Sequence, residues 1–266
     1  MLHDHESRRL AWNACVNARD VGGYQTLDGE RIRSHALVRT DNLHHLTPEA
    51  QRAVLDYGVR TVLDLRMLHE LEIHPNPFAT PQAGLDSVQN EGSPRYLNLQ
   101  ILERDDTETS AALDEATSMA DEYRVMLSRR KESIGAAIKA VVAGLGEGGV
   151  LVHCHGGKDR TGIVVALLLS LAGVPRETVT EDYALSEERL EPYHAAWLEE
   201  QSKAQGAPVE RPRWMASRPE TMRDALSYLD QEYGGVEAYL QTAGVTRAEV
   251  ARIRRYLTAP ADNMSL

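Results

Sequence analysis

The sequence predicts an α/β fold, with a central, mostly parallel sheet flanked by helices. Short apolar runs such as residues 59–65 and 149–152 are typical of buried strands, and they alternate along the chain with helical patterns. Continuous apolar runs are characteristic of parallel strands that are covered on both faces. Alternating strands and helices place helices on both sides of such a sheet. We expect one domain over residues 1–266, a length that a single core can support.

The N-terminal part is expected to begin with short elements. A short helix is predicted at residues 7–10. The pair Asp28-Gly29 is a strong tight-turn signal and predicts a hairpin over residues 24–33. The apolar run 36–39 predicts a further strand.

A helix over residues 48–57 has clear start and stop signals. Thr47 can cap its N-terminus, and Pro48 is favourable at the first helical position. Gly58 ends the helix. The buried strand 59–65 follows directly.

The middle of the chain is less regular. Residues 72–92 contain several prolines and predict an irregular loop. The alternating run 95–101 predicts a strand. From 114 to 145 the pattern predicts two helices that are separated near residues 129–132.

The C-terminal part is predicted to be mostly helical. An apolar helix at 162–171 ends at a glycine, and the next helix covers residues 174–185. A polar helical excursion and a loop follow over 187–218. Further helices are predicted at 219–232, 236–242 and 246–257.

The chemistry is concentrated at residues 153–162, which read HCHGGKDRTG. This stretch lies between the strand 149–152 and the N-terminus of an apolar helix. Backbone N–H groups are unpaired there, and the helix dipole is positive. A glycine-containing loop at this position predicts an anion site at the carboxyl end of the sheet.

The side chains of this loop indicate what happens to the anion. Cys154 is surrounded by N–H groups and a guanidinium, which favours the thiolate. Arg160 can hold two phosphate oxygens at once. Thr161 is placed to donate its hydroxyl to the sulfur. Together these residues predict a nucleophile directed at a bound phosphate.

The same ten residues match the Cys-x5-Arg signature of the cysteine-based protein tyrosine phosphatases. The pair Lys158-Asp159 resembles the bacterial tyrosine/serine-protein phosphatase branch, whose loop is similar to that of phosphoinositide phosphatases. Three other stretches also resemble this branch: NARDVGGY at 17–24, LDLR at 63–66 with Glu70, and YGGVEAYL at 233–240.

The resemblance implies a fold of the cysteine-phosphatase type and hydrolysis of phosphomonoesters through a cysteinyl-phosphate, without a metal or cofactor. The expected substrates are phosphorylated proteins or phosphoinositides. Cys154, Arg160 and Asp159 would be catalytic, with Thr161 and His153 in supporting roles. The substrate phosphate would be held by the loop, formed by His155, Gly156, Gly157, Lys158, Asp159 and Arg160.

The general acid that protonates the leaving oxygen is left open by the residues themselves. Asp105 and Asp106 follow the strand at 95–101, and Asp86 lies in the irregular loop. Asp159 lies in the phosphate-binding loop itself, and the resemblance favours it.

Several neighbours are expected to support the structure. His153 is expected to bond backbone near the thiolate, and Lys158 either contacts phosphate or lies at the rim. Arg66 and Glu70 are four residues apart and could pair, although structural roles are favoured. Asp182 is expected to be structural, with positioning of the phosphate loop as the alternative. Arg19 and Asp20 would brace the loop or a turn, and the segments 103–130 and 187–218 are candidates for a lid.

Composition excludes several other classes of protein. The formal net charge of -11 argues against nucleic acid as partner and against nonspecific binding to anionic membranes. The two cysteines, Cys15 and Cys154, are too few for a disulfide framework, which favours a reducing compartment and a cytoplasmic location. No signal peptide or transmembrane run is apparent. Cys15 is expected to be a buried structural residue, with a redox link to Cys154 as the alternative.

Four rival interpretations remain weaker. A Walker nucleotide loop needs Ser or Thr where Asp159 stands. Metal binding by His153, Cys154 and His155 lacks a second ligand pair with suitable spacing. A binding module without turnover would not explain the intact Cys154, Arg160 and Thr161. The pair Lys158-Asp159 and the flanking resemblance disfavour an enzyme of sulfur or arsenate chemistry. The oligomeric state is left open by the sequence.

Overall fold

The computed structural model describes residues 7–79 and 92–260. A five-stranded sheet forms its centre, in the order β1-β3-β6-β4-β5. β3, β6, β4 and β5 run parallel, and β1 joins the edge antiparallel to β3. The predicted, mostly parallel sheet is therefore confirmed. Its strands are β1 (Arg19–Asp20), β3 (Leu37–Thr40), β4 (Val59–Asp64), β5 (Arg95–Asn98) and β6 (Gly149–His153).

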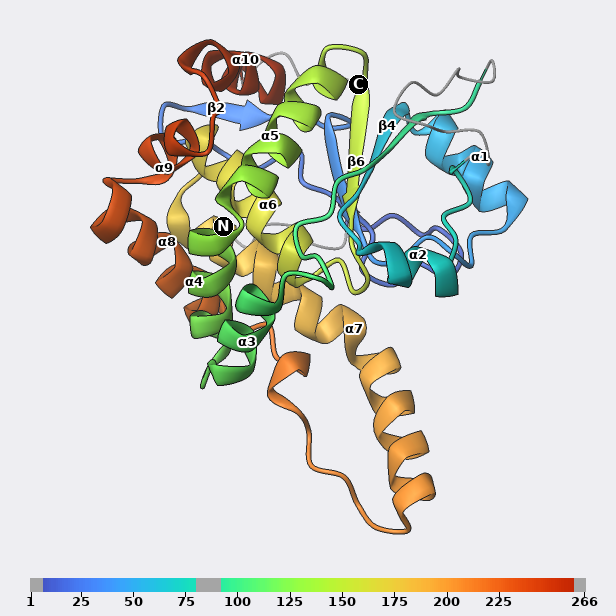
Figure 1. The fold of residues 1–266 in the computed structure, drawn as a ribbon. Coiled ribbons are helices and arrows are strands. Elements are labelled where there is room, and N and C mark those ends of the chain that lie inside the picture. Colours follow the sequence, from blue (N-terminus) through green and yellow to red (C-terminus); the bar gives the residue numbers. More distant parts are fainter. Residues whose placement is uncertain (1–6, 80–91, 261–266) are drawn as a thin grey trace.

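Helices cover both faces of the sheet (Figure 1). On one face, α5 (Lys131–Leu145) and α6 (Asp159–Leu171) pack against β6, whose Val150 and Val152 belong to their core. On the other face, α1 (Pro48–Asp56) packs against β4, and Leu151 joins that smaller core. Because side chains alternate along a strand, β6 contributes to both cores and is fully buried.

The remaining helices follow the predicted order. Thr47 caps α1 as expected, and the predicted separation near 129–132 falls at Arg130. A capping box of Thr246 and Glu249 begins the last helix. These helices are α4 (Met119–Arg129), α8 (Pro219–Tyr233), α9 (Val236–Thr242) and α10 (Arg247–Leu257). The helix α3 (Thr107–Glu115) was not predicted, because the helical pattern of the sequence begins at residue 114.

The N-terminal part differs from the local predictions at two places. Residues 7–10 form a turn and a bridge to Arg19 instead of a helix, because their backbone groups pair with the N-terminal strand region. The hairpin at 24–33 does form, with Ile32 N bonded to Tyr24 O and Thr26 N to Glu30 O, and β2 (Glu30–Ile32) also pairs with the C-terminal β7 (Thr258–Pro260). The short helix α2 (Leu68–Ile73) was not predicted.

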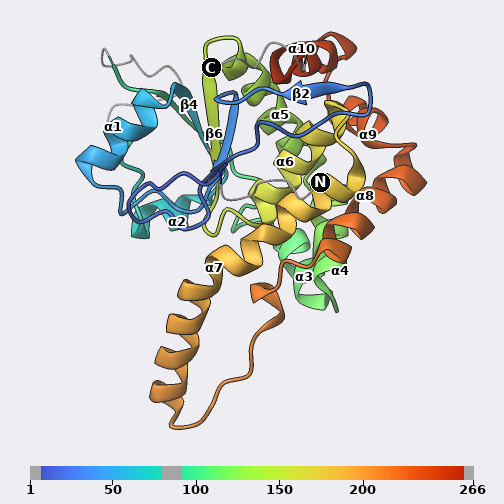
Figure 2. The same cartoon turned by 180° about the vertical axis from the view of Figure 1, so that it is seen from behind.

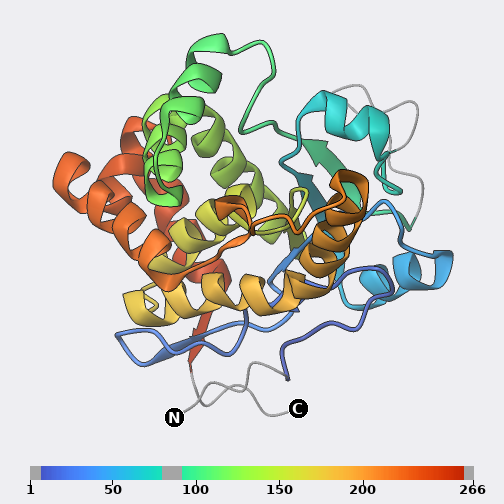
Figure 3. The ribbon, with the colours of Figure 1, turned by 90° about the horizontal axis from the view of Figure 1, so that it is seen from below.

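A single long helix, α7 (Arg176–Gln205), replaces the predicted helix at 174–185 and most of the excursion. It continues through Pro192, and its distal half extends beyond the body of the molecule (Figures 1 and 2). The chain then returns beside it through the short helix η1 (Arg213–Met215). Viewed from below, α7 and this returning segment lie across the end of the sheet (Figure 3). None of the helices in the described ranges combines the length and the apolar character that crossing a bilayer requires.

Candidate active site

The loop of residues 154–160 connects β6 to α6 at the carboxyl end of the central strand. We call it the phosphate loop. Cys154 is only 2% exposed, and together with Arg160 it lines a cavity of about 580 Å³. α6 begins at Asp159, earlier than predicted, so the end of the loop is also the first turn of the helix. Its unpaired N–H groups are therefore available to an anion in the cavity.

Gly157 gives the phosphate loop its shape. Its φ is +63°, and a Cβ atom there would lie 2.1 Å from the carbonyl oxygen of Thr40. The loop's carbonyls are bound from outside: Gly157 O accepts from Arg39 Nη2 at 2.8 Å, and Gly156 O accepts from Asn17 Nδ2 at 2.9 Å. Because the C=O and N–H of a trans peptide point in opposite directions, these bonds favour N–H groups that face inward.

Asp182 lies at the centre of the network that braces the loop. Its carboxylate accepts from Arg19 Nε at 3.1 Å and from Arg39 Nη1 at 2.7 Å. The hydroxyl of Tyr24 donates to it as well, at 3.1 Å. Burial alone would raise the pKa of Asp182, but the two arginines outweigh it and hold the pKa below its ordinary value. Of the two roles considered for Asp182, positioning of the loop is the one that the contacts support.

Arg160 is held by a residue outside the loop. Its Nη1 and Nη2 donate to the two carboxylate oxygens of Glu70 at 2.5 and 2.9 Å. Burial opposes the charge of Arg160, yet the pair with Glu70 raises its pKa above the ordinary value. The pairing of Arg66 with Glu70 is absent, since Arg66 Nη2 binds Asp64 Oδ2 at 2.6 Å.

His153 lies beneath the loop, as expected. Its Nε2 is 3.2 Å from Asp64 Oδ2, and its Nδ1 is 3.1 Å from the carbonyl oxygen of Cys154. Burial would raise the pKa of Asp64, but His153 and Arg66 hold it below the ordinary value. A fixed carboxylate therefore orients the imidazole beside the backbone of Cys154.

Among the candidate acids that the structure describes, Asp159 is the one that lies in the cavity. The hydroxyl of Tyr123, on α4, donates to its Oδ1 at 2.7 Å. Asp106 instead caps α3, accepting from the backbone N–H of Thr109 at 3.0 Å. Asp105 is absent from the residues that line this cavity, and Asp86 lies outside the described residues.

Lys158 and Thr161 both differ from what the sequence indicates. The ammonium group of Lys158 donates to the carbonyls of Trp214 and Ala216, the latter at 2.8 Å, and it lies 3.3 Å from Asp159. It therefore ties the segment at η1 to the phosphate loop. The hydroxyl of Thr161 is buried without a hydrogen-bond partner in the described part of the chain, so the expected bond to Cys154 is not formed.

The chain is similar to known proteins over most of its length. A model of the tyrosine phosphatase family matches residues 10–259. The chain belongs to this family. It is 28% identical to a tyrosine-protein phosphatase of Nostoc commune, covering 84% of this chain and 74% of the relative. It is also 28% identical to the triple specificity protein phosphatase PtpB of Mycobacterium tuberculosis, covering 93% of this chain and 96% of that one.

In this member of the tyrosine phosphatase family, both candidate lid segments reach the site. Tyr193 and Trp197 of α7 line the cavity together with Trp214, and the two tryptophan rings meet edge to face at 5.5 Å. The other segment contributes Tyr123, which contacts Asp159.

The second cysteine of this phosphatase family member, Cys15, is not bonded to Cys154. Cys15 and Cys154 are both free and buried, so no disulfide joins them. Burial, and next the charge of Asp41, raise the pKa of Cys15 to about 12, which keeps it a thiol at neutral pH. The described residues contain no cluster of three or more acidic, histidine or cysteine side chains that could hold a metal.

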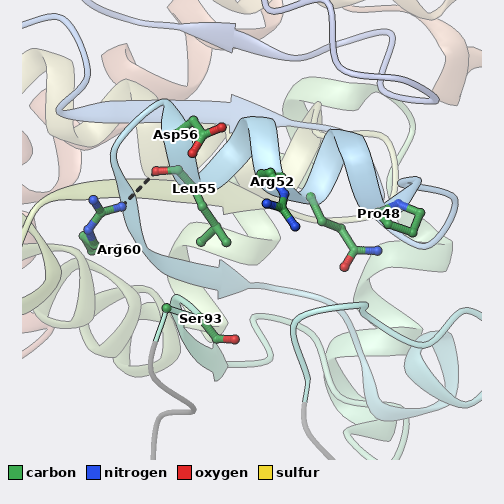
Figure 4. A pocket seen from close by; sticks show the side chains of 8 residues that line it. Pro48, Arg52, Leu55, Asp56, Arg60 and Ser93 are labelled. Carbon is green, nitrogen blue, oxygen red and sulfur yellow. Dashed lines mark hydrogen bonds between the residues drawn. The ribbon is translucent and has the colours of Figure 1, made fainter.

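Another cavity, of about 650 Å³, lies away from Cys154 beside α1 (Figure 4). Arg60 spans one side of it and donates to the carbonyl of Leu55 at 2.9 Å. Its wall continues to Ser93 and Gly92, where the described residues resume, and we assign no ligand to it.

Proposed function

We propose that this protein hydrolyses phosphomonoesters on phosphorylated protein side chains, with Cys154 as the nucleophile. The thiolate attacks phosphorus and forms an S–P bond while the P–O bond to the leaving group breaks. Asp159 gives its proton to the leaving oxygen. Water then attacks the cysteinyl-phosphate, passes its proton to Asp159 and releases phosphate and thiolate.

Arg160 and the loop N–H groups stabilise the charge on the phosphoryl oxygens during both steps. The pair with Glu70 occupies one N–H of each terminal nitrogen of Arg160, so three of its five N–H donors remain for phosphate. The observation that carries the proposal is that Cys154, Arg160 and Asp159 line one cavity at a helix N-terminus.

A phosphorylated tyrosine is the substrate that the cavity favours. Tyr193, Trp197 and Trp214 offer an apolar wall for a phenyl ring above the nucleophile. The names of the relatives, tyrosine-protein phosphatase and triple specificity protein phosphatase, agree with this choice. Phosphoserine and phosphoinositide headgroups are further candidates of the same chemistry. The two free cysteines support function in a reducing compartment such as the cytoplasm.

The test is hydrolysis of p-nitrophenyl phosphate in the presence of EDTA. Wild type and the matched control Cys15→Ser should be active, whereas Cys154→Ser should lose all turnover. Activity that survives Cys154→Ser would show a different nucleophile. A wild-type protein that binds phosphotyrosine peptides without turnover would instead be a binding module.

The role of Asp159 requires a leaving group that needs a proton. Asp159→Asn should slow hydrolysis of phenyl phosphate much more than that of p-nitrophenyl phosphate, whose leaving group is stable as an anion. Equal losses on the two substrates would contradict the assignment.

A further inference from the structure

Of the five histidines that line the same cavity as Cys154, four lie beside the phosphate loop. Three chain segments bring them together: the stretch before α1, the end of α2 and the loop itself. The ring of His74 lies 4.1 Å from that of His44 and 6.0 Å from that of His155. The set consists of His44, His45, His74 and His155. We call it the histidine cluster.

Asn42, next to the cluster, has an unused donor. It is 7% exposed and lines the cavity. Its Oδ1 accepts from Arg66 Nη1 at 2.9 Å and from the backbone N–H of His44 at 3.3 Å. The orientation of the amide is thereby fixed, and its Nδ2 has no acceptor within the described residues. A buried N–H₂ group without an acceptor is unfavourable, so this position suits a ligand that accepts hydrogen bonds.

The acids around the cluster already have partners. Glu70 lies 3.9 Å from His155 Nδ1 but binds Arg160 through both oxygens. Asp64 binds Arg66 and His153, while Asp41 accepts from the backbone N–H groups of Val16 and Asn17.

Imidazole rings and the guanidinium of Arg66 surround His44. Burial and then His45, His74, Arg66 and His155 lower the pKa of His44 to about 4. A negative group placed among these rings would relieve that repulsion and accept their N–H donors.

We propose that Asn42 and the histidine cluster form a second anion subsite, which binds another phosphate on the same phosphopeptide substrate. The proposal rests on the function proposed above and deepens it. His155 directly follows the nucleophile, and Asn42 N donates to the carbonyl of His155 at 2.8 Å, so the subsite adjoins the phosphate loop.

An extended peptide can present two phosphates to one surface. Side chains two residues apart lie on one face of an extended chain, about 6.6 Å from each other. A phosphotyrosine at Cys154 would thus place a phosphoserine two residues away at the cluster. A peptide is favoured over an anionic bilayer because the protein carries a formal net charge of -11.

The test compares two peptides that differ by one phosphate, pTyr-Ala-pSer and pTyr-Ala-Ser, by the release of phosphate from tyrosine. Wild type should show a kcat/KM about tenfold higher for the doubly phosphorylated peptide, the effect of one added charge-assisted interaction. The double variant His44→Gln/His74→Gln should bring this ratio close to one. The matched control is His35→Gln, because His35 stacks on Tyr57 outside the cavity, and it should keep the ratio.

A wild-type ratio near one, or a ratio that the double variant retains, would overturn the subsite. The same ratio of kcat/KM can be measured for inositol 1,4-bisphosphate over inositol 1-phosphate. If this ratio exceeds the ratio for the two peptides, the second phosphate belongs to a headgroup and the peptide assignment is wrong. Failure of the proposed function would look different, since wild type would then leave p-nitrophenyl phosphate and both peptides unhydrolysed.

Discussion

Glu70 accepts two hydrogen bonds from Arg160, and so a carboxylate on α2 fixes the guanidinium of the phosphate loop. The two residues are 90 positions apart in the sequence. The arginine can therefore be aligned for phosphate before any substrate arrives.

The variant Glu70→Gln tests this alignment. The neutral amide can accept only one of the two bonds, so Arg160 should lose its fixed orientation. We expect kcat/KM for p-nitrophenyl phosphate to fall about 10- to 100-fold, as when a residue that orients a ligand is removed. Glu72→Gln, on the same helix, is the control. An unchanged kcat/KM in Glu70→Gln would show that the loop alone orients Arg160.

The adjacent glycines Gly156 and Gly157 of the phosphate loop should differ in how well they tolerate substitution by alanine. Gly157→Ala should abolish turnover, because its Cβ would lie 2.1 Å from Thr40 O and its φ is +63°. At Gly156 a Cβ would lie 3.6 Å from Leu190 Cδ1, which is an ordinary contact. Gly156→Ala should therefore lose far less activity than Gly157→Ala. Steady-state kinetics of the pair, with circular dichroism to check folding, would test the difference. Equal losses would contradict it.

Asp182 should contribute to stability above about pH 4. Its pKa is depressed in the folded state, so the contribution is present above the unfolded value near 3.9 and is lost as pH falls through the folded value. Asp182→Asn should cost about 3–5 kcal/mol at pH 7, because it leaves Arg19 and Arg39 buried without the charge. Urea unfolding should be measured from pH 7 to pH 3. The difference in the free energy of unfolding between wild type and Asp182→Asn should become smaller below pH 4. A difference that does not vary with pH would rule out the ionised carboxylate as its source.

Lys158 should hold the returning segment at η1 against the phosphate loop. Lys158→Met removes the donor to Trp214 O and Ala216 O while keeping much of the apolar length. We expect faster hydrogen exchange at residues 206–216, with α10 unchanged as an internal reference. Lys203→Met, which removes only an exposed pair with Glu199, is the control. Unaltered exchange in Lys158→Met would mean that other contacts hold the segment.

The sequence was most informative where local signals decide the structure. The apolar run of β6, the capping residue Thr47 and the glycines around Cys154 predicted the sheet, the first helix and the phosphate loop. The predicted helix at 7–10 does not form, because the backbone there pairs with another part of the chain. The strand β7 was not predicted for the same reason, since it depends on pairing with β2.

The partners of the site were harder to predict than its loop. Glu70 stood out in the sequence only by resemblance, and spacing suggested Arg66 as its partner. In the structure, Arg66 instead pairs with Asp64, and Glu70 pairs with Arg160. Lys158 carries no local sign that it binds carbonyls far along the chain. Such pairings depend on the packing of α2 and α7, which periodicity does not specify.

The hydrogen-bond network around Asp182, which supports the phosphate loop, also affects the order of folding steps. Arg19 and Asp182 are 163 positions apart, and Arg39 contacts both Asp182 and Gly157. On the ribosome the nucleophile therefore emerges before the residue that completes its support. Contacts so distant in sequence form slowly, since the intervening chain must first be closed into a loop. Turnover should thus appear as a late step of refolding, after most helical structure has formed.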